Sequence, residues 1–179
     1  MSNLSQKGIT INTTDAGHVD ASDHALLFSA IFGMNGILNV GSKMEISKQS
    51  DNKIRIMDGM YMMSNGVLIR IENYEDITIT SGTLGQKRKD IIIAEYIKNG
   101  NGTGDDVAKI RVVNGTYSSA NPVEPTLVNN GTTIQEKLAT LLIDETTMTI
   151  DSVSAKVMPI RLYRLSKSQR GISVVSLSK

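Results

Sequence analysis

The chain has 179 residues, of which 40% are hydrophobic and 4% aromatic, and its 19 Lys and Arg nearly balance its 18 Asp and Glu. This length fits one domain whose core can fold without metals or disulfides, and the near-neutral charge argues against a protein that binds nucleic-acid phosphates. The sequence contains no cysteine, which excludes a thiol nucleophile, a disulfide and a cysteine-ligated zinc site.

Residues 20–33 predict a helix in an otherwise β-rich sequence. Asp20 or Ser22 can cap its N-terminus, and Gly33 can end it. Apolar residues cover two neighbouring sides of this helix, which gives it a wide apolar stripe. The large apolar residues are candidates for an oligomer interface: Leu27, Phe28, Ile31 and Phe32. We assign residues 1–48 to an N-terminal arm that includes the helix.

Asparagine–glycine pairs divide the middle of the chain into short segments. There are six such pairs, and Asp58-Gly59 adds a similar one. Both residues of such a pair tolerate the positive φ angles that a type I′ hairpin turn requires. Between the pairs, apolar and polar residues alternate as in strands with one buried face. The alternating segments are residues 53–56, 61–63, 67–72 and 77–80, and we expect Asp58-Gly59 to turn the chain between the first two.

The most apolar segment is the run 90–96, which we interpret as a strand buried on both faces. Residues 107–113 follow a glycine-rich loop and are expected to pair back on this strand as a hairpin. Residues 118–131 hold two of the three prolines without a clear period, so they predict a long surface loop. Residues 132–144 suit a helix or a strand. We favour a strand, because threonines begin the segment and the β-like residues 148–153 follow it.

Together these elements predict a mainly β chain, an antiparallel β-sandwich over residues 49–155 with a short N-terminal helix before it. Residues 156–179 are expected to form an added strand or an arm that reaches a neighbouring chain. Their apolar positions mix with basic ones at Arg161, Arg164, Lys167, Arg170 and Lys179. The N-terminal sequence MSNLSQKGIT lacks the apolar run of a secretory signal or a membrane anchor, so we expect no insertion into a membrane.

One cluster of residues resembles a metal site in composition: His18, Asp20, Asp23 and His24. The spacing of the two histidines does not place them on one helix face, and the chain has no His-x-x-x-His pair. The start of a helix explains the cluster better, since an acidic residue in the first turn complements the helix dipole.

Other candidates for chemistry also have simpler explanations. The loop from Gly100 to Gly104 lacks the Lys-Ser/Thr of a phosphate-binding loop and runs into Asp105 and Asp106, whose spacing is irregular for calcium. No Gly-x-Ser-x-Gly motif is present. Three acids could imitate a glycosidase pair, but solvated loop acids are the simpler interpretation: Glu72, Glu75 and Asp76. We therefore expect no enzyme, no cofactor and no metal.

Arg88 and Asp90 stand at the start of the buried run and are two residues apart. In a strand, residues at this spacing point to the same face. A guanidinium beside a carboxylate there would fix the approach of the chain to the sheet, with backbone amides satisfying the remaining oxygen positions. We predict that this pair is structural and performs no reaction.

Residues 85–96, GQKRKDIIIAEY, resemble the Arg-x-Asp-x-Ile/Val-Val-x-Arg stretch of phage tail and baseplate proteins. Residues 17–23 and 30–33 are similar to the N-terminal part of a prophage structural family from Gram-positive bacteria. Over residues 8–155, the order of elements resembles the shoulder region of siphophage baseplate and receptor-binding proteins. Glu95 departs from the pattern, because the family often has Arg at this position, so the partner of Glu95 is left open.

The resemblance implies a β-sandwich shoulder domain in a symmetric assembly, often a trimer, that attaches to other baseplate or tail proteins. We therefore expect a phage virion structural protein, a tail-tip or baseplate scaffold or connector that assembles in the bacterial cytoplasm. It would act by oligomerisation and docking and would not bind nucleic acid. The apolar helix and the methionines suggest apolar surface that needs a partner, notably Met57, Met60, Met62 and Met63.

The alternative is a receptor-binding or carbohydrate-binding protein that recognises host cell-wall saccharide. The absence of tryptophan counts against a sugar-stacking cleft. Tyrosines could still supply a shallow site: Tyr61, Tyr74, Tyr96, Tyr117 and Tyr163.

Overall fold

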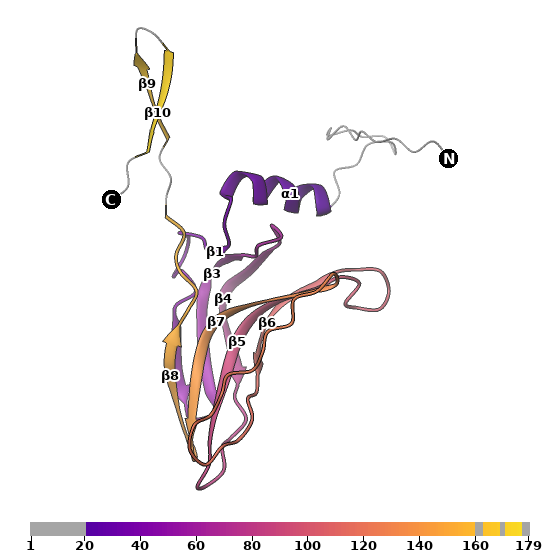
Figure 1. Cartoon of the computed structure of the whole chain (residues 1–179), viewed down its shortest axis with the longest axis vertical. Coiled ribbons are helices and arrows are strands. Elements are labelled where there is room, and N and C mark those ends of the chain that lie inside the picture. The colour runs from indigo at the N-terminus through magenta and orange to yellow at the C-terminus, as the bar shows by residue number, and fades with distance from the viewer. Residues whose placement is uncertain (1–20, 160–162, 169–170, 177–179) are drawn as a thin grey trace.

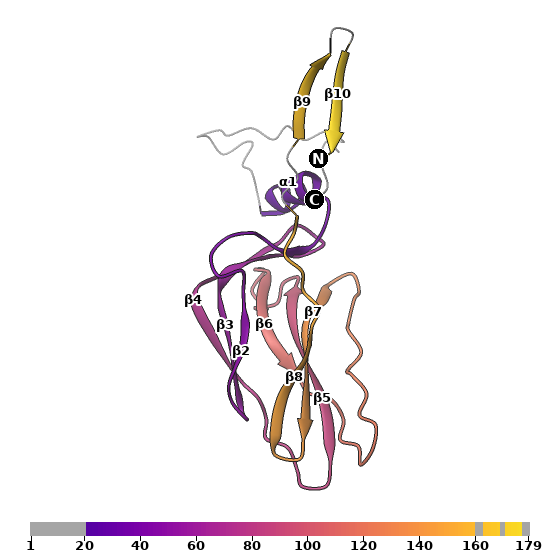
Figure 2. The same cartoon turned by 90° about the vertical axis from the view of Figure 1, so that its left-hand side faces the viewer.

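Two antiparallel sheets and one helix make up most of the computed structural model, which describes residues 21–159, 163–168 and 171–176 (Figures 1 and 2). In the first sheet, β3 pairs with β4 along one edge and with β1 and β2 along the other. Its strands are β1 (Gly36–Ile37), β2 (Ile46–Ser50), β3 (Lys53–Met62) and β4 (Leu68–Thr78). Strand pairing thus begins at Gly36, before the boundary that we expected at residue 49.

The second sheet has the strand order β6-β5-β7-β8, all antiparallel. Its strands are β5 (Lys87–Ile97), β6 (Val107–Val113), β7 (Thr133–Asp144) and β8 (Thr147–Val153). The segment that suited either a helix or a strand is therefore a strand, as we favoured. It lies beside β5 in the middle of the sheet, where its apolar residues can face both sides.

The helix α1 (Ala21–Phe32) lies at one end of the sandwich, and the turn between β7 and β8 lies at the other (Figure 1). Gly33 ends the helix as predicted, with a positive φ of 65° and a hydrogen bond from its N–H to the Ser29 carbonyl. Of the two predicted N-terminal caps, Ser22 lies inside the helix, which begins at Ala21, and Asp20 lies outside the described residues. A hairpin of β9 (Tyr163–Ser168) and β10 (Gly171–Ser176) confirms strand structure in the C-terminal segment. Within the described part of the chain, α1 is too short to cross a membrane.

The core lies between the two sheets and is made of aliphatic side chains. Ile54 and Ile56 of β3 face Ile92 of β5 and Leu141 of β7, and all four are fully buried. Burying one such side chain stabilises the fold by about 1.5–3 kcal/mol. The alternation seen in the sequence of β3 and β4 follows from this arrangement, since their other face is turned to solvent.

The strand β5 is buried on both faces, as the sequence predicted. Ile91 and Ile93 point away from the core between the sheets and are nevertheless fully buried. The loop 114–131 runs across this outer face, where Glu124 accepts hydrogen bonds from Lys137 and Thr140 of β7. The predicted surface loop thus covers the second sheet.

Two expectations about the first sheet are wrong. Asp58-Gly59 makes no hairpin turn. It forms a β-bulge within β3, at the register shift between Met57 and Gly59. Gly59 is required there because its φ is 154° and a Cβ would come within 2.8 Å of the Met44 backbone nitrogen. The apolar surface expected at four methionines is also wrong for two of them, because Met62 and Met63 are buried, whereas Met57 and Met60 are half-buried.

Candidate functional site: a buried arginine–aspartate pair and an exposed helix

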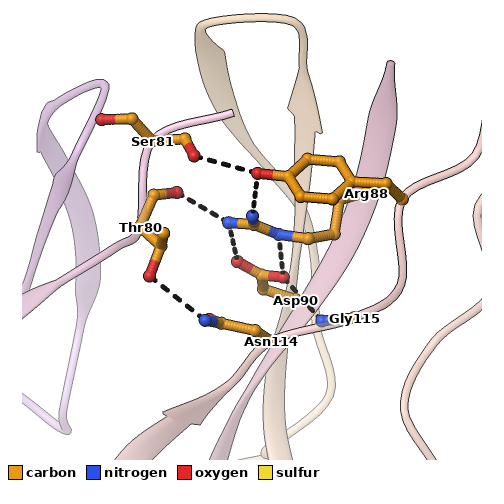
Figure 3. Close-up of polar contacts among 7 residues, drawn as sticks. Thr80, Ser81, Arg88, Asp90, Asn114 and Gly115 are labelled. Atoms are coloured by element: carbon orange, nitrogen blue, oxygen red, sulfur yellow. Dashed lines mark hydrogen bonds and ion pairs between the residues drawn. The ribbon is translucent and has the colours of Figure 1, made fainter. Parts of the chain in front are cut away.

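The predicted pair of Arg88 and Asp90 forms a buried, bidentate ion pair on the inward face of β5 (Figure 3). Arg88 Nε donates to Asp90 Oδ1 at 2.7 Å, and Nη2 donates to Oδ2 at 2.9 Å. Only 2% of the Arg88 side chain and 0% of the Asp90 side chain are exposed. Both residues share the face of Ile92, as their spacing in a strand predicted.

Two further segments, residues 80–81 and 115–117, complete the hydrogen bonds of this pair. Arg88 Nη2 also donates to the Thr80 carbonyl at 2.6 Å, and Nη1 donates to the Tyr117 hydroxyl at 2.7 Å. The Tyr117 hydroxyl in turn donates to the Ser81 carbonyl. The Gly115 amide donates to Asp90 Oδ1 at 2.8 Å (Figure 3). Among the described residues, no buried side-chain nitrogen or oxygen lacks a hydrogen-bond partner.

These contacts join the two sheets at the end opposite α1. Thr80 and Ser81 belong to the connection that follows β4 of the first sheet, whereas Arg88 and Asp90 begin β5 of the second. Gly115 and Tyr117 follow β6, so the Arg88–Asp90 network also fixes where the covering loop starts. A Cβ at Gly115 would lie 2.1 Å from the Lys89 carbonyl, and glycine is therefore needed for this close approach. Every polar group of the ion pair is thus held by hydrogen bonds within the chain.

A second ion pair explains Glu95, whose partner the sequence left open. Arg111 of β6 donates to both Glu95 oxygens, at 2.7 and 2.6 Å. Gln135 of β7 donates to the same carboxylate, and its own oxygen accepts from the Val128 amide in the covering loop. The pKa of Glu95 lies below its ordinary value, and the hydrogen bond from Arg111 is the largest cause. Burial of the Glu95 carboxylate has the opposite, smaller effect.

The helix α1 presents apolar residues to solvent. We define its outward face as Leu26, Leu27, Ala30 and Ile31, which cover an arc of about 140° at roughly 100° per residue. Leu26 is 67% exposed, Leu27 50% and Ile31 63%. The opposite side of the helix holds the half-buried residues Ala25, Phe28 and Ser29, and the Ala25 backbone lies beside Gly66 of the turn between β3 and β4.

The structure therefore places only some of the predicted interface residues on the outward face. Leu27 and Ile31 lie on the outward face, Phe32 is 37% exposed at the helix end, and Phe28 is half-buried. Leu26 was not among the predicted interface residues, because the helical stripe alone does not show which side of the helix meets the sandwich. A surface helix normally turns its polar side outward. In α1 the outward face is instead the more apolar one.

Other candidates from the sequence do not assemble into a site in the described part of the chain. No group of three or more His, Asp or Glu there could hold a metal ion. Asp105 and Asp106 are taken up by hydrogen bonds within the 99–106 loop, and Asp76 forms a bidentate pair with Arg55. His18 lies outside the described residues.

The four tyrosines with described side chains are dispersed and do not form a common cleft. Tyr61 is buried in the core, and Tyr117 is bound to Arg88 and Ser81. Tyr74 is exposed, with the Arg55 guanidinium 3.8 Å from its ring centroid. Tyr96 donates to Asp106, which is the main reason that the pKa of Tyr96 rises to about 12. The side chain of Tyr163 lies outside the described ones.

Comparison with known proteins identifies no relative, because no family model matches the chain and no curated protein sequence matches it significantly.

We predict that Asp90→Ala and Arg88→Ala each destabilise the protein strongly. Removing one partner of a fully buried ion pair leaves the other charge unpaired, which costs about 3–5 kcal/mol. The double variant should lose less than the sum of the two single changes, as denaturant unfolding of the four chains would measure. Lys87→Ala and Lys89→Ala are the controls. Their side chains form half-exposed ion pairs with Asp144 and Asp151, so each change should cost at most about 1 kcal/mol. Additive losses at Arg88 and Asp90 would contradict a coupled pair.

We also predict that Glu95 contributes to acid unfolding. Its pKa lies below the ordinary 4.5 in the folded state, so its stabilisation is complete above that value and is lost as the pH falls through the lowered pKa. Glu95→Gln should therefore lower stability near pH 7 and flatten its decline below about pH 4.5. Urea unfolding across this range measures the effect. Glu72→Gln, at a 73% exposed side chain, is the matched control and should leave the profile unchanged.

Proposed function

We propose that this protein is a structural component of a phage tail tip or baseplate, a scaffold or connector that acts by oligomerisation and docking. The observation that carries the proposal is the outward face of α1, where Leu26, Leu27 and Ile31 are at least half exposed. Large exposed apolar patches on a soluble protein commonly mark protein–protein contacts. The resemblance of residues 85–96 to tail and baseplate proteins supports the choice of assembly.

The way in which α1 is attached also supports a docking role. The helix lies directly against the turn between β3 and β4, where a Cβ at Gly66 would come within 1.8 Å of the Ala25 carbonyl. This turn belongs to a sheet that is held to its partner by an aliphatic core and by the Arg88–Asp90 network. An apolar surface on a rigid support loses little conformational entropy when a partner binds.

The proposal includes a homo-oligomer, with a trimer favoured, in which copies of α1 bury their outward faces. We predict that Leu27→Ser combined with Ile31→Ser converts the assembly to a monomer, because each change removes about 1.5–3 kcal/mol of apolar burial. Light scattering at micromolar concentration measures the mass. The matched control replaces Leu84 and Val123, which are 74% and 77% exposed on the sandwich, by Ser and should leave the mass unchanged. A monodisperse monomer of the unaltered chain would refute self-association.

The virion location is tested separately. In a bacterial strain that encodes this chain, purified phage particles should contain it, and immunogold labelling should place it at the tail tip. Deleting its gene should yield particles that fail to adsorb to the host, because the tail tip is incomplete. The Leu84 and Val123 double variant should restore adsorption, and the Leu27 and Ile31 double variant should not. Normal particles and normal adsorption after deletion would refute the proposal.

A further inference from the structure

Glu136, near the start of β7, binds three segments of the chain at the end of the sandwich that carries α1. Its Oε2 accepts from the Asn35 side-chain amide at 2.7 Å and from the Tyr61 hydroxyl at 2.9 Å. Its Oε1 accepts from the Ser64 backbone amide at 2.8 Å. We call Glu136, Asn35, Tyr61 and Ser64 the Glu136 cluster. One carboxylate thus links β7 of the second sheet to three points of the chain between α1 and β4.

Two of these points determine how α1 is seated. Asn35 belongs to the short connection between Gly33, which ends the helix, and β1. A change in this connection would change the orientation of the helix. Ser64 lies in the turn between β3 and β4, the same turn whose Gly66 meets the Ala25 carbonyl of the helix. The carboxylate therefore fixes both the connection and the surface against which the helix rests.

The third contact anchors Glu136 to the core. Tyr61 is 3% exposed, and its ring packs among the aliphatic side chains between the sheets. Burial, together with the neighbouring Glu136 carboxylate, raises the pKa of Tyr61. The hydroxyl therefore stays protonated and continues to donate to Glu136. Glu136 itself is half-buried and lines a pocket of about 360 Å³ with Asn35 and Tyr61.

We propose that Glu136 is the positioning residue of α1. It holds the outward face of the helix in the orientation that docking to a second copy of the chain requires. The inference rests on the proposed docking function and adds a specific residue to it. Glu136 touches none of the four residues of the outward face, so its effect on docking would act through the connection at Asn35 and the turn at Ser64.

A side chain of similar size without a strong acceptor makes the test specific. Glu136→Met keeps a similar length, and its thioether sulfur is only a weak acceptor. Asn35, Tyr61 and Ser64 all donate to the carboxylate, so all three hydrogen bonds are lost or greatly weakened. The aliphatic side chains between the sheets are unchanged, so circular dichroism should show a folded sandwich.

The helix orientation can be measured without relying on assembly. The chain has no cysteine, so His24→Cys on the exposed N-terminal part of α1 gives a single site for a nitroxide spin label. The label is placed in the non-associating Leu27 and Ile31 double variant. With Glu136 present, its spectrum should be dominated by a slowly tumbling component, because the helix is held against the sandwich. With Glu136→Met the mobile component should become the major one.

Assembly gives the second readout, in the unlabelled chain with its native α1. If about a tenth of the helices keep the competent orientation, both copies in a contact are affected, so the apparent dissociation constant between two copies should rise by about a hundredfold. Glu124→Met is the matched control. It changes a carboxylate that also accepts two side-chain hydrogen bonds at β7 but holds the covering loop instead of the helix connection. This control should change neither the spectrum nor the dissociation constant.

Gly66→Ala tests the contact between the β3–β4 turn and the helix, since the added Cβ would collide with the Ala25 carbonyl. It should also raise the mobile component. An unchanged spectrum in folded Glu136→Met overturns the positioning role, whatever the unaltered chain does in solution. A changed spectrum in a chain that never associates supports the positioning role and refutes only the self-association through α1.

Discussion

The bidentate pair of Arg88 and Asp90 is the interaction on which the arrangement of the sheets depends. Buried charges are tolerated only when they are paired and fully hydrogen-bonded. Here that requirement brings the carbonyls of Thr80 and Ser81, the amide of Gly115 and the hydroxyl of Tyr117 to one point. Because these groups come from the connection after β4 and the segment after β6, satisfying one ion pair fixes the crossing between the sheets and the start of the covering loop.

Polar contacts join the sheets at both ends of the sandwich, and aliphatic side chains join them in between. At the end opposite the helix the Arg88–Asp90 network connects the start of β5 to the chain after β4. At the helix end Glu136 of β7 connects to Tyr61 and Ser64 of the first sheet. Directional hydrogen bonds at the ends specify the relative placement of the sheets, which an aliphatic core alone does not do. A defined placement is what a helix needs if its apolar side is to meet a partner in a fixed geometry.

The sequence predicted the strands correctly where the burial of their faces alone explains the pattern of apolar residues. Alternation along β3 and β4 reflects one face in the core and one in solvent, and the run 90–96 reflects a strand covered on both faces. The prediction was wrong at Asp58-Gly59, because a pair that permits positive φ suits a bulge as well as a turn. A bulge forms instead of a turn because β4 is long enough to pair with β3 on both sides of Asp58-Gly59. It was also wrong for Met62 and Met63, since residue type does not tell a buried methionine from an exposed one.

By itself the sequence determined the fold class, the helix and the pairing of Arg88 with Asp90, because each depends on residues a few positions apart. Two residues in one strand share a face, and a glycine after an apolar helical stripe ends a helix. Only the tertiary structure decided which groups complete the Arg88–Asp90 network, since Tyr117 lies 29 residues from Arg88. It also decided that Leu26 faces solvent while Phe28 is half-buried, and that Glu136 reaches Asn35 across 101 residues. Contacts between distant segments depend on how the sheets pack, and local patterns of residues do not encode that packing.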